Sequence, residues 1–127
     1  MKAVARASES QASELELAAV MKALSDETRL RIYALLGRAE LCVCEIEDIL
    51  GLGQSLVSNH LSVLRRVGLV TARRDERDAR WIFYRACTTT ASSVREMLDA
   101  LFDVRPTASN KRRAESVCRL KGRSTRG

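Results

Sequence analysis

The sequence contains no long apolar run. None of its hydrophobic stretches approaches the roughly 18 residues that a membrane-spanning helix requires, and residues 1–6 lack the apolar core of a signal peptide. We therefore expect a cytoplasmic protein with no membrane partner. At 127 residues, of which 46% are hydrophobic, the chain is long enough for one core of ordinary stability.

The sequence also has little of what most enzyme sites require. Its only histidine is His60, no cysteine and histidine occur together at a catalytic spacing, and neither a phosphate-binding glycine loop nor a CxxxxxR loop is present. A core of this size leaves little room for a deep substrate pocket. We therefore expect no enzymatic activity and no organic cofactor.

Acidic residues are absent between residues 49 and 74, a stretch that carries four arginines. Residues 1–48 hold 6 Lys or Arg against 9 Asp or Glu, whereas residues 49–127 hold 16 against 7, and the net charge is +6. A basic half of this kind fits a surface that faces nucleic-acid phosphates. A solvated basic face has the same composition, so charge alone leaves both interpretations open.

Apolar spacing predicts five helices and one β-hairpin. Helical periodicity covers residues 12–24, 26–36, 43–50, 54–67 and 90–102. Residues rich in β-formers predict strands at 69–74 and 80–86. Ser25 is the predicted cap of the second helix, and Gly51 and Gly53 permit the tight reversal of a helix-turn-helix. Ile46 and Ile49 are predicted to point inward, and Trp81 with Phe83, or Ile82 with Tyr84, are interpreted as core residues rather than as platforms for nucleotide stacking.

These elements predict a mainly α (α+β) fold, a winged helix-turn-helix with a two-stranded hairpin as its wing. The expected organisation is a flexible N-terminus over residues 1–11, a DNA-binding and dimerisation domain over 12–103, and a flexible basic tail over 104–127. The first and last helices leave more apolar surface than one small domain covers, so we expect a homodimer. A homodimer predicts operator DNA with an inverted repeat.

The helix predicted at 54–67 has a face suited to reading DNA. Val57, Leu61 and Leu64 form its apolar stripe, while another stripe is small, polar and uncharged. Such a stripe can approach base edges and phosphates without charge repulsion. The candidate DNA-binding residues on this helix and the wing are Gln54, Ser55, Ser58, Asn59, Ser62, Arg65, Arg66, Arg74 and Arg77.

Cys42 and Cys44 are separated by one residue and stand directly before the helix-turn-helix. Thiolates favour thiophilic ions, so the pair points toward As(III), Sb(III), Cd(II) or Pb(II). Positions i and i+2 lie about 200° apart on a regular helix, so holding one ion there would distort the turn. The other interpretation is that both cysteines are small buried apolar residues. Cys87 is expected to be buried, and Cys118 is either an idle thiol or a recruited ligand.

Four ordered strings carry a family resemblance: ALSDETRLRI at 23–32, ELCVCE at 40–45, VSNHL at 57–61 with GLV at 68–70, and RWIFYR at 80–85. Together they resemble the ArsR/SmtB metalloregulators over about residues 12–103. The resemblance implies a homodimeric transcriptional repressor that binds operator DNA and releases it when an inducer binds. The ELCVCE string resembles the arsenic and antimony sensors of that family, in which the two cysteines supply inducer thiolates.

One departure from the resemblance concerns the third thiolate. Some arsenic sensors carry a cysteine at the position matching Glu47. A third sulfur would therefore come from Cys118, less readily Cys87, a partner thiol or a small thiol, or the ion would remain two-coordinate. Cadmium and lead sensors add N-terminal cysteines, which residues 1–41 lack. The alternatives that stay open are a Cd(II) or Pb(II) sensor, a thiol-based redox or persulfide-sensing repressor, and an architectural DNA-binding protein without a switch.

Overall fold

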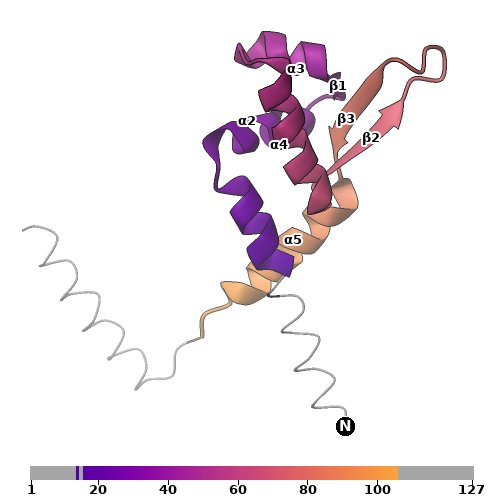
Figure 1. The fold of residues 1–127 in the computed structure, drawn as a ribbon. Coiled ribbons are helices and arrows are strands. Elements are labelled where there is room, and N and C mark those ends of the chain that lie inside the picture. The colour runs from indigo at the N-terminus through magenta and orange to yellow at the C-terminus, as the bar shows by residue number, and fades with distance from the viewer. Residues whose placement is uncertain (1–13, 15, 106–127) are drawn as a thin grey trace, which may run out of the picture.

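The computed structural model describes residue 14 and residues 16–105. Residues 16–24 are helical, and the further elements are α2 (Glu27–Leu36), β1 (Leu41–Cys42), α3 (Val43–Leu50), α4 (Gln54–Arg66), β2 (Val70–Arg74), β3 (Ile82–Ala86) and α5 (Thr88–Leu101) (Figure 1). In this part of the chain, no helix is both long and apolar enough to cross a membrane. The predicted segment 1–11, nearly all of 104–127, and Cys118 lie outside the described residues.

The helix-turn-helix consists of α3 and α4, and their predicted positions are confirmed. Gly51 ends α3 in the left-handed conformation, with a φ of 67°, which few residues other than glycine adopt without strain. Its N–H donates to the Glu47 carbonyl at 2.7 Å, and α4 starts three residues later. Helix α3 packs against α4, so the position of the second helix depends on that of the first.

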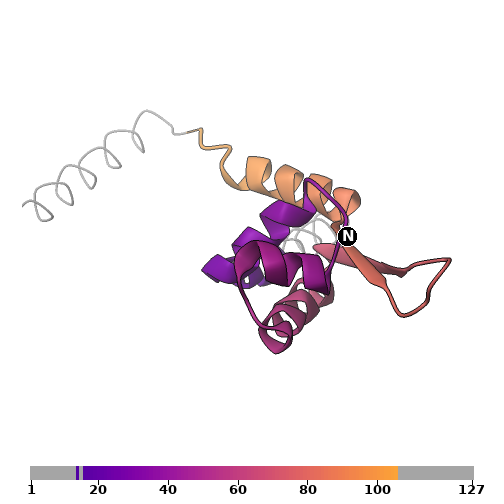
Figure 2. The same ribbon diagram turned by 90° about the horizontal axis from the view of Figure 1, so that it is seen from above.

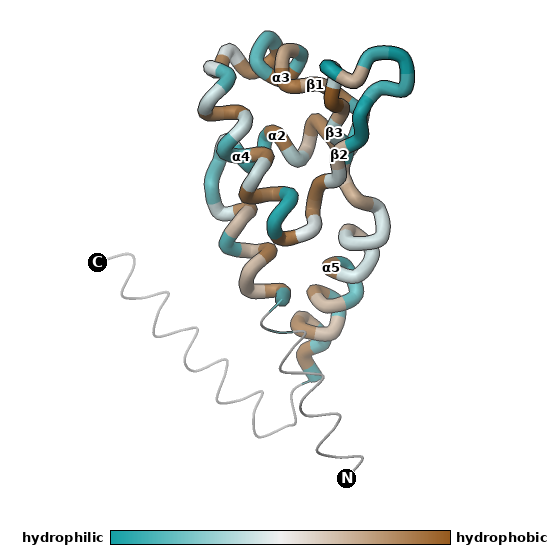
Figure 3. The backbone as a smooth tube through the Cα atoms, turned by 45° about the vertical axis from the view of Figure 1, so that its right-hand side comes forward, coloured by the Kyte–Doolittle hydropathy of each residue, from teal (hydrophilic) through white to brown (hydrophobic). Residues whose placement is uncertain are grey.

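The sheet has three strands rather than the predicted two. Its order is β1-β3-β2, with both pairs antiparallel, and β2 and β3 project from the helices as the wing (Figures 1 and 2). The tip between them is hydrophilic (Figure 3). Strand β1 has only two residues, too few for a periodic pattern, yet it pairs Cys42 with Phe83. The first cysteine is therefore joined directly to the wing.

The core gathers side chains from all parts of the fold, and Ile32, Ile46, Val57 and Leu64 are fully buried. The inward assignment of Ile49 is wrong, because this side chain is 55% exposed. Residues three apart on a helix are offset by about 60°. Helix α3 is only two turns long and buries the side that carries Ile46, so Ile49 lies outside that contact.

Ser25 is not the cap of α2. Its hydroxyl donates to the Lys22 carbonyl at 2.7 Å and so closes the preceding helix. The residue that caps α2 is Asp26, which has extended backbone angles and accepts a 3.0 Å hydrogen bond from the Arg29 N–H. That bond lowers the pKa of Asp26. With two adjacent residues that can both cap a helix, the sequence did not distinguish them.

Candidate DNA interface and thiol site

The polar stripe of α4 faces outward over its whole length. The candidate residues Gln54, Ser55, Ser58, Asn59, Ser62, Arg65 and Arg66 are all exposed. Their exposure follows from the buried stripe on the other side of the helix, where Val57, Leu61 and Leu64 are 0–1% exposed. Nothing in the described fold covers this stripe, so α4 can present it to the major groove of a DNA duplex.

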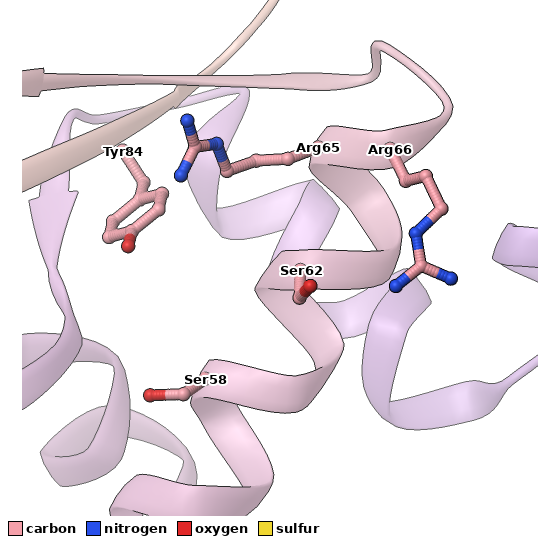
Figure 4. Close-up of a pocket in the computed structure, with 5 residues that line it drawn as sticks. All are labelled: Ser58, Ser62, Arg65, Arg66 and Tyr84. Carbon is pink, nitrogen blue, oxygen red and sulfur yellow. The ribbon is translucent and has the colours of Figure 1, made fainter.

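A groove of about 370 Å³ lies between α4 and the wing and is lined by Ser58, Ser62, Arg65, Arg66 and Tyr84 (Figure 4). Arg65 extends toward the Tyr84 ring, whereas Arg66 extends from the other side of the helix end. The groove combines three hydroxyls with two guanidinium groups, all of which can donate hydrogen bonds. Its chemistry suits the phosphate backbone of DNA.

Sequence reasoning missed Tyr84 as a surface residue. Tyr84 is half-buried and packs against the core while also lining the groove. Neighbouring residues of a strand face opposite sides of a sheet, so Tyr84 and Phe83 belong to different faces of β3. That alternation was the available signal, because it assigns Tyr84 to one face of the wing and Phe83 to the other.

The arginines of the wing differ in their partners. Arg73 is ion-paired with Glu40, which lowers the pKa of Glu40, and Arg80 is paired with Asp78 at 2.9 Å. The two candidate DNA-binding arginines of the wing, Arg74 and Arg77, are exposed. Arg74 donates to the Ala79 carbonyl at 3.2 Å, and within the described residues no acidic side chain forms an ion pair with Arg77.

Cys42 has a conformation that the sequence did not indicate. It is the N-cap of α3, with extended angles of φ −88° and ψ 169°, and its N–H donates to the Glu45 carboxylate at 3.1 Å. Burial raises the pKa of the Cys42 thiol, and the Glu45 carboxylate acts in the same direction. Because Cys42 is not helical, the 200° separation of a regular helix does not apply to this pair.

The two thiols open onto one groove. This groove, about 410 Å³ in volume, is lined by Cys42, Cys44, Glu45, Asp48, Asp75, Trp81 and Phe83. Cys42 is buried and Cys44 is exposed, so the pair spans the depth of the groove. Trp81, one of the two alternatives for the core side of this strand, is not a core residue, since its side chain is 45% exposed where the tip of the wing meets β3. We refer to these seven residues as the thiol groove.

Cys42 and Cys44 supply the only sulfurs of the thiol groove among residues 14 and 16–105. Within the described residues, no three His, Cys, Asp or Glu side chains are arranged to hold a metal ion.

Cys87 is half-buried rather than buried, and it is the N-cap residue of α5. Hydrogen bonds with Thr90 and Thr89 lower the pKa of Cys87 to about 7. Glu47 keeps one carboxylate oxygen buried without a hydrogen-bond partner.

His60, the single histidine, is not part of the thiol groove. Its Nδ1 lies 3.4 Å from a guanidinium nitrogen of Arg29, which in turn donates through Nε to the Ala23 carbonyl at 2.5 Å. Arg29 therefore connects α2, the preceding helix and α4. This arrangement favours a positioning role for His60 over metal binding.

Comparisons with known proteins agree on one family. Residues 26–72 match the family model "Bacterial regulatory protein, arsR family". The arsenic resistance transcriptional regulator ArsR2 of Pseudomonas putida is 38% identical over 103 residues, which cover 80% of this chain and 84% of the relative. ArsR1 of the same strain is 39% identical over 85 residues, covering 66% of this chain and 64% of that protein's length.

A solved structure with the same fold is the homodimeric winged helix-turn-helix DNA-binding domain of a possible ArsR-family transcriptional regulator from Mycobacterium bovis. It superimposes with a TM-score of 0.58 at 29% sequence identity, covering 73% of this chain and 83% of that chain. The winged helix-turn-helix fold expected from the sequence is therefore confirmed.

Proposed function

The chain belongs to the ArsR family of bacterial regulatory proteins, and from this premise we propose that it is a metalloid-responsive repressor. It binds operator DNA as a homodimer and dissociates when As(III) or Sb(III) is bound by Cys42 and Cys44. One observation carries the proposal: both thiols line a single groove at the start of the helix that packs against α4. The arsenic-resistance names of its relatives support the choice of inducer.

The exposed stripe of α4 and the groove beside Tyr84 supply the surface for DNA in this proposal. Apolar residues on the terminal helices supply the dimer interface. Met21, Leu101 and Phe102 are 50–69% exposed, and a groove of about 670 Å³ runs between the first helix and α5. Exposed apolar surface of this kind is typical of a protein–protein contact. Two recognition helices related by a twofold axis would read an inverted repeat.

The residues present fit a trivalent metalloid in part. When trivalent arsenic binds thiols, bonds from arsenic to sulfur replace bonds from arsenic to hydroxyl. Each thiol proton then leaves with a hydroxyl group as water. This exchange suits Cys42, whose raised pKa keeps it a thiol, because no net proton loss is needed. The third bond of As(III) would be completed by Cys118, by a partner-chain thiol or by a small thiol.

The coupling to DNA follows from the position of Cys42 at a junction. Cys42 ends β1, where it pairs with Phe83 of the wing, and α3 starts at the next residue. If the sulfurs of Cys42 and Cys44 both bound one arsenic atom, the backbone between β1 and α3 would have to shift. Since α3 packs on α4, we expect the recognition stripe to shift in both subunits and the affinity for DNA to fall.

A second candidate function is a thiol-based redox sensor, and the lowered pKa of Cys87 favours it. A pKa of about 7 gives this partly exposed thiol a substantial thiolate fraction at neutral pH, and thiolates are the form that peroxide oxidises. On this alternative, Cys87 rather than the thiol groove would receive the signal.

The experiment that separates these functions measures operator release. Fluorescence anisotropy of a labelled operator duplex is followed during titration with arsenite, antimonite, Cd(II) or Zn(II), with a phosphine reductant. A parallel titration uses peroxide in metal-free buffer without reductant. Release by arsenite and antimonite supports the metalloid switch. Release by peroxide alone selects the redox sensor, and release by Cd(II) alone selects a cadmium sensor.

A further inference from the structure

We propose that Arg29 and His60 act as a positioning pair that fixes the orientation of α4 relative to the first helix, residues 16–24. Through that orientation, the pair determines how strictly the homodimer requires one spacing between the two half-sites of its operator. The inference rests on the proposed function, because it needs a homodimer that binds operator DNA. It does not involve the thiol groove or the inducer.

The guanidinium group of Arg29 contacts a helix on either side of its own. Its Nε donates to the Ala23 carbonyl near the end of the first helix at 2.5 Å, and one of its Nη atoms lies 3.4 Å from Nδ1 of His60 on α4. Ala23 is buried and His60 is half-buried, so both contacts are partly shielded from water. Because a guanidinium group holds its donors in one rigid plane, the two contacts together relate the position of α4 to that of the first helix.

The main chain of Arg29 is held as well. Its N–H donates to the carboxylate of Asp26, the N-cap of α2, at 3.0 Å. Helix α2 in turn packs against α4. The arginine is therefore fixed at its backbone as well as at the Ala23 carbonyl, and the contact with His60 extends this fixed group to α4.

The contact with His60 imposes a chemical requirement. A guanidinium group donates hydrogen bonds and accepts none, so Nδ1 of His60 must be the unprotonated ring nitrogen. A distance of 3.4 Å is long for a hydrogen bond, so the contact contributes orientation more than stability. Another side chain at position 60 should therefore replace histidine only if it offers an acceptor at the position of Nδ1.

The place of the pair in the fold connects it to the spacing of half-sites. The first helix carries the exposed Met21, which the proposed function assigns to the dimer interface, whereas α4 carries the exposed stripe assigned to DNA. In a dimer, the separation of the two copies of α4 depends on how rigidly each is joined to its own first helix. Half-sites lie about one helical turn of DNA apart, and one inserted base pair changes their separation by about 3.4 Å. A loosened α4 should tolerate that insertion.

The test measures the binding of three duplexes to the full chain by fluorescence anisotropy. The first is the inverted repeat that the wild type selects from a randomised pool, the second is the same repeat with one base pair inserted between its half-sites, and the third is random DNA. The ratio of the dissociation constants for the inserted and the selected repeat measures the spacing requirement. His60→Leu keeps a side chain of similar size without an acceptor. It should lower this ratio about fivefold and leave the affinity for random DNA unchanged within about twofold.

His60→Asn is the matched control, because the asparagine Oδ1 takes the place of Nδ1, and it should restore most of the ratio. Arg29→Leu should lower the ratio as His60→Leu does, and the double variant should lower it no further, since the same contact is lost in each case. Arg31→Leu on the same helix, where the arginine is paired with Glu27 at 2.8 Å, should leave the ratio unchanged. Far-ultraviolet circular dichroism checks that each variant is folded.

The outcomes separate this inference from the proposed function. A ratio that His60→Leu leaves unchanged, or that His60→Asn does not restore, would overturn the positioning pair even if arsenite still releases DNA. Equal losses of affinity for the selected repeat and for random DNA would instead assign His60 to a direct phosphate contact, and additive effects of His60→Leu and Arg29→Leu would show that the two residues act separately. A wild type that binds no inverted repeat as a dimer would overturn the proposed function and this inference with it.

Discussion

Replacing Arg65 with alanine tests whether the groove between α4 and the wing receives DNA phosphate. Arg65 is exposed at the C-terminal end of α4 and extends toward Tyr84 (Figure 4). In a homodimer the substitution removes two guanidinium groups, one from each half-site. Each lost phosphate contact lowers the slope of log K against log salt by about 0.9. We therefore expect the slope to fall in magnitude by about 1.8.

This slope change has a measurable consequence for affinity. Between about 50 and about 200 mM salt, the affinity penalty of Arg65→Ala should shrink about twelvefold, because fewer counterions are released. Fluorescence anisotropy with an operator duplex and a scrambled duplex gives both slopes. The matched control is Arg31→Ala on α2, where the arginine is paired with Glu27 at 2.8 Å. An unchanged slope for Arg65→Ala, or an equal change for Arg31→Ala, would refute the assignment.

Three further predictions concern single positions. Gly51→Ala should reduce the free energy of unfolding in urea by about 1–2 kcal/mol, because a φ of 67° strains a residue that has a Cβ. No atom lies within 4 Å of the added Cβ, so a steric clash does not contribute. A loss of stability smaller than the error of the fit would contradict the argument from backbone strain. The rate of alkylation of Cys87 should reach half its maximum near pH 7. Thr90→Val should move this midpoint to higher pH. An unchanged midpoint would show that Thr90 does not lower the pKa of Cys87. Ser58→Ala and Asn59→Ala should change the preference among single-base operator variants more than the affinity for random DNA, and equal losses on both would exclude direct readout.

Apolar periodicity predicted the two helices of the helix-turn-helix. The limits of α3 and α4 could be predicted because Ile46 and the stripe of Val57, Leu61 and Leu64 repeat at helical spacing and are buried. Strand β1 could not be predicted in this way. Two residues carry no periodic signal, and β1 exists only because β3 offers a free edge to Leu41 and Cys42.

Residue types in the sequence indicated which side chains to consider for the candidate site, but not their geometry. The spacing of Cys42 and Cys44 identified the pair, but the extended backbone of Cys42 depends on its pairing with Phe83, a contact between distant parts of the chain. The same holds for Trp81, since only the folded wing brings it to the thiol groove. The lowered pKa of Cys87 depends on hydrogen bonds that form once α5 begins beside it.

The central claim is that Cys42 and Cys44 couple inducer binding to DNA release. Serine preserves the size of cysteine but is a hard, weak ligand, and it is a good N-cap at position 42, so both variants should fold and bind DNA. Cys87→Ser and Cys118→Ser are the matched controls, and Cys118→Ser also tests the third sulfur, since it lowers the affinity for As(III) if the tail supplies it.

The decisive measurement is the arsenite concentration that releases half of the operator DNA, determined for the wild type and for each single serine variant. The account predicts that Cys42→Ser and Cys44→Ser keep wild-type affinity for DNA and no longer release it at any arsenite concentration that frees the wild type. Cys87→Ser should release DNA as the wild type does. Wild-type dose dependence in both Cys42→Ser and Cys44→Ser would contradict the account.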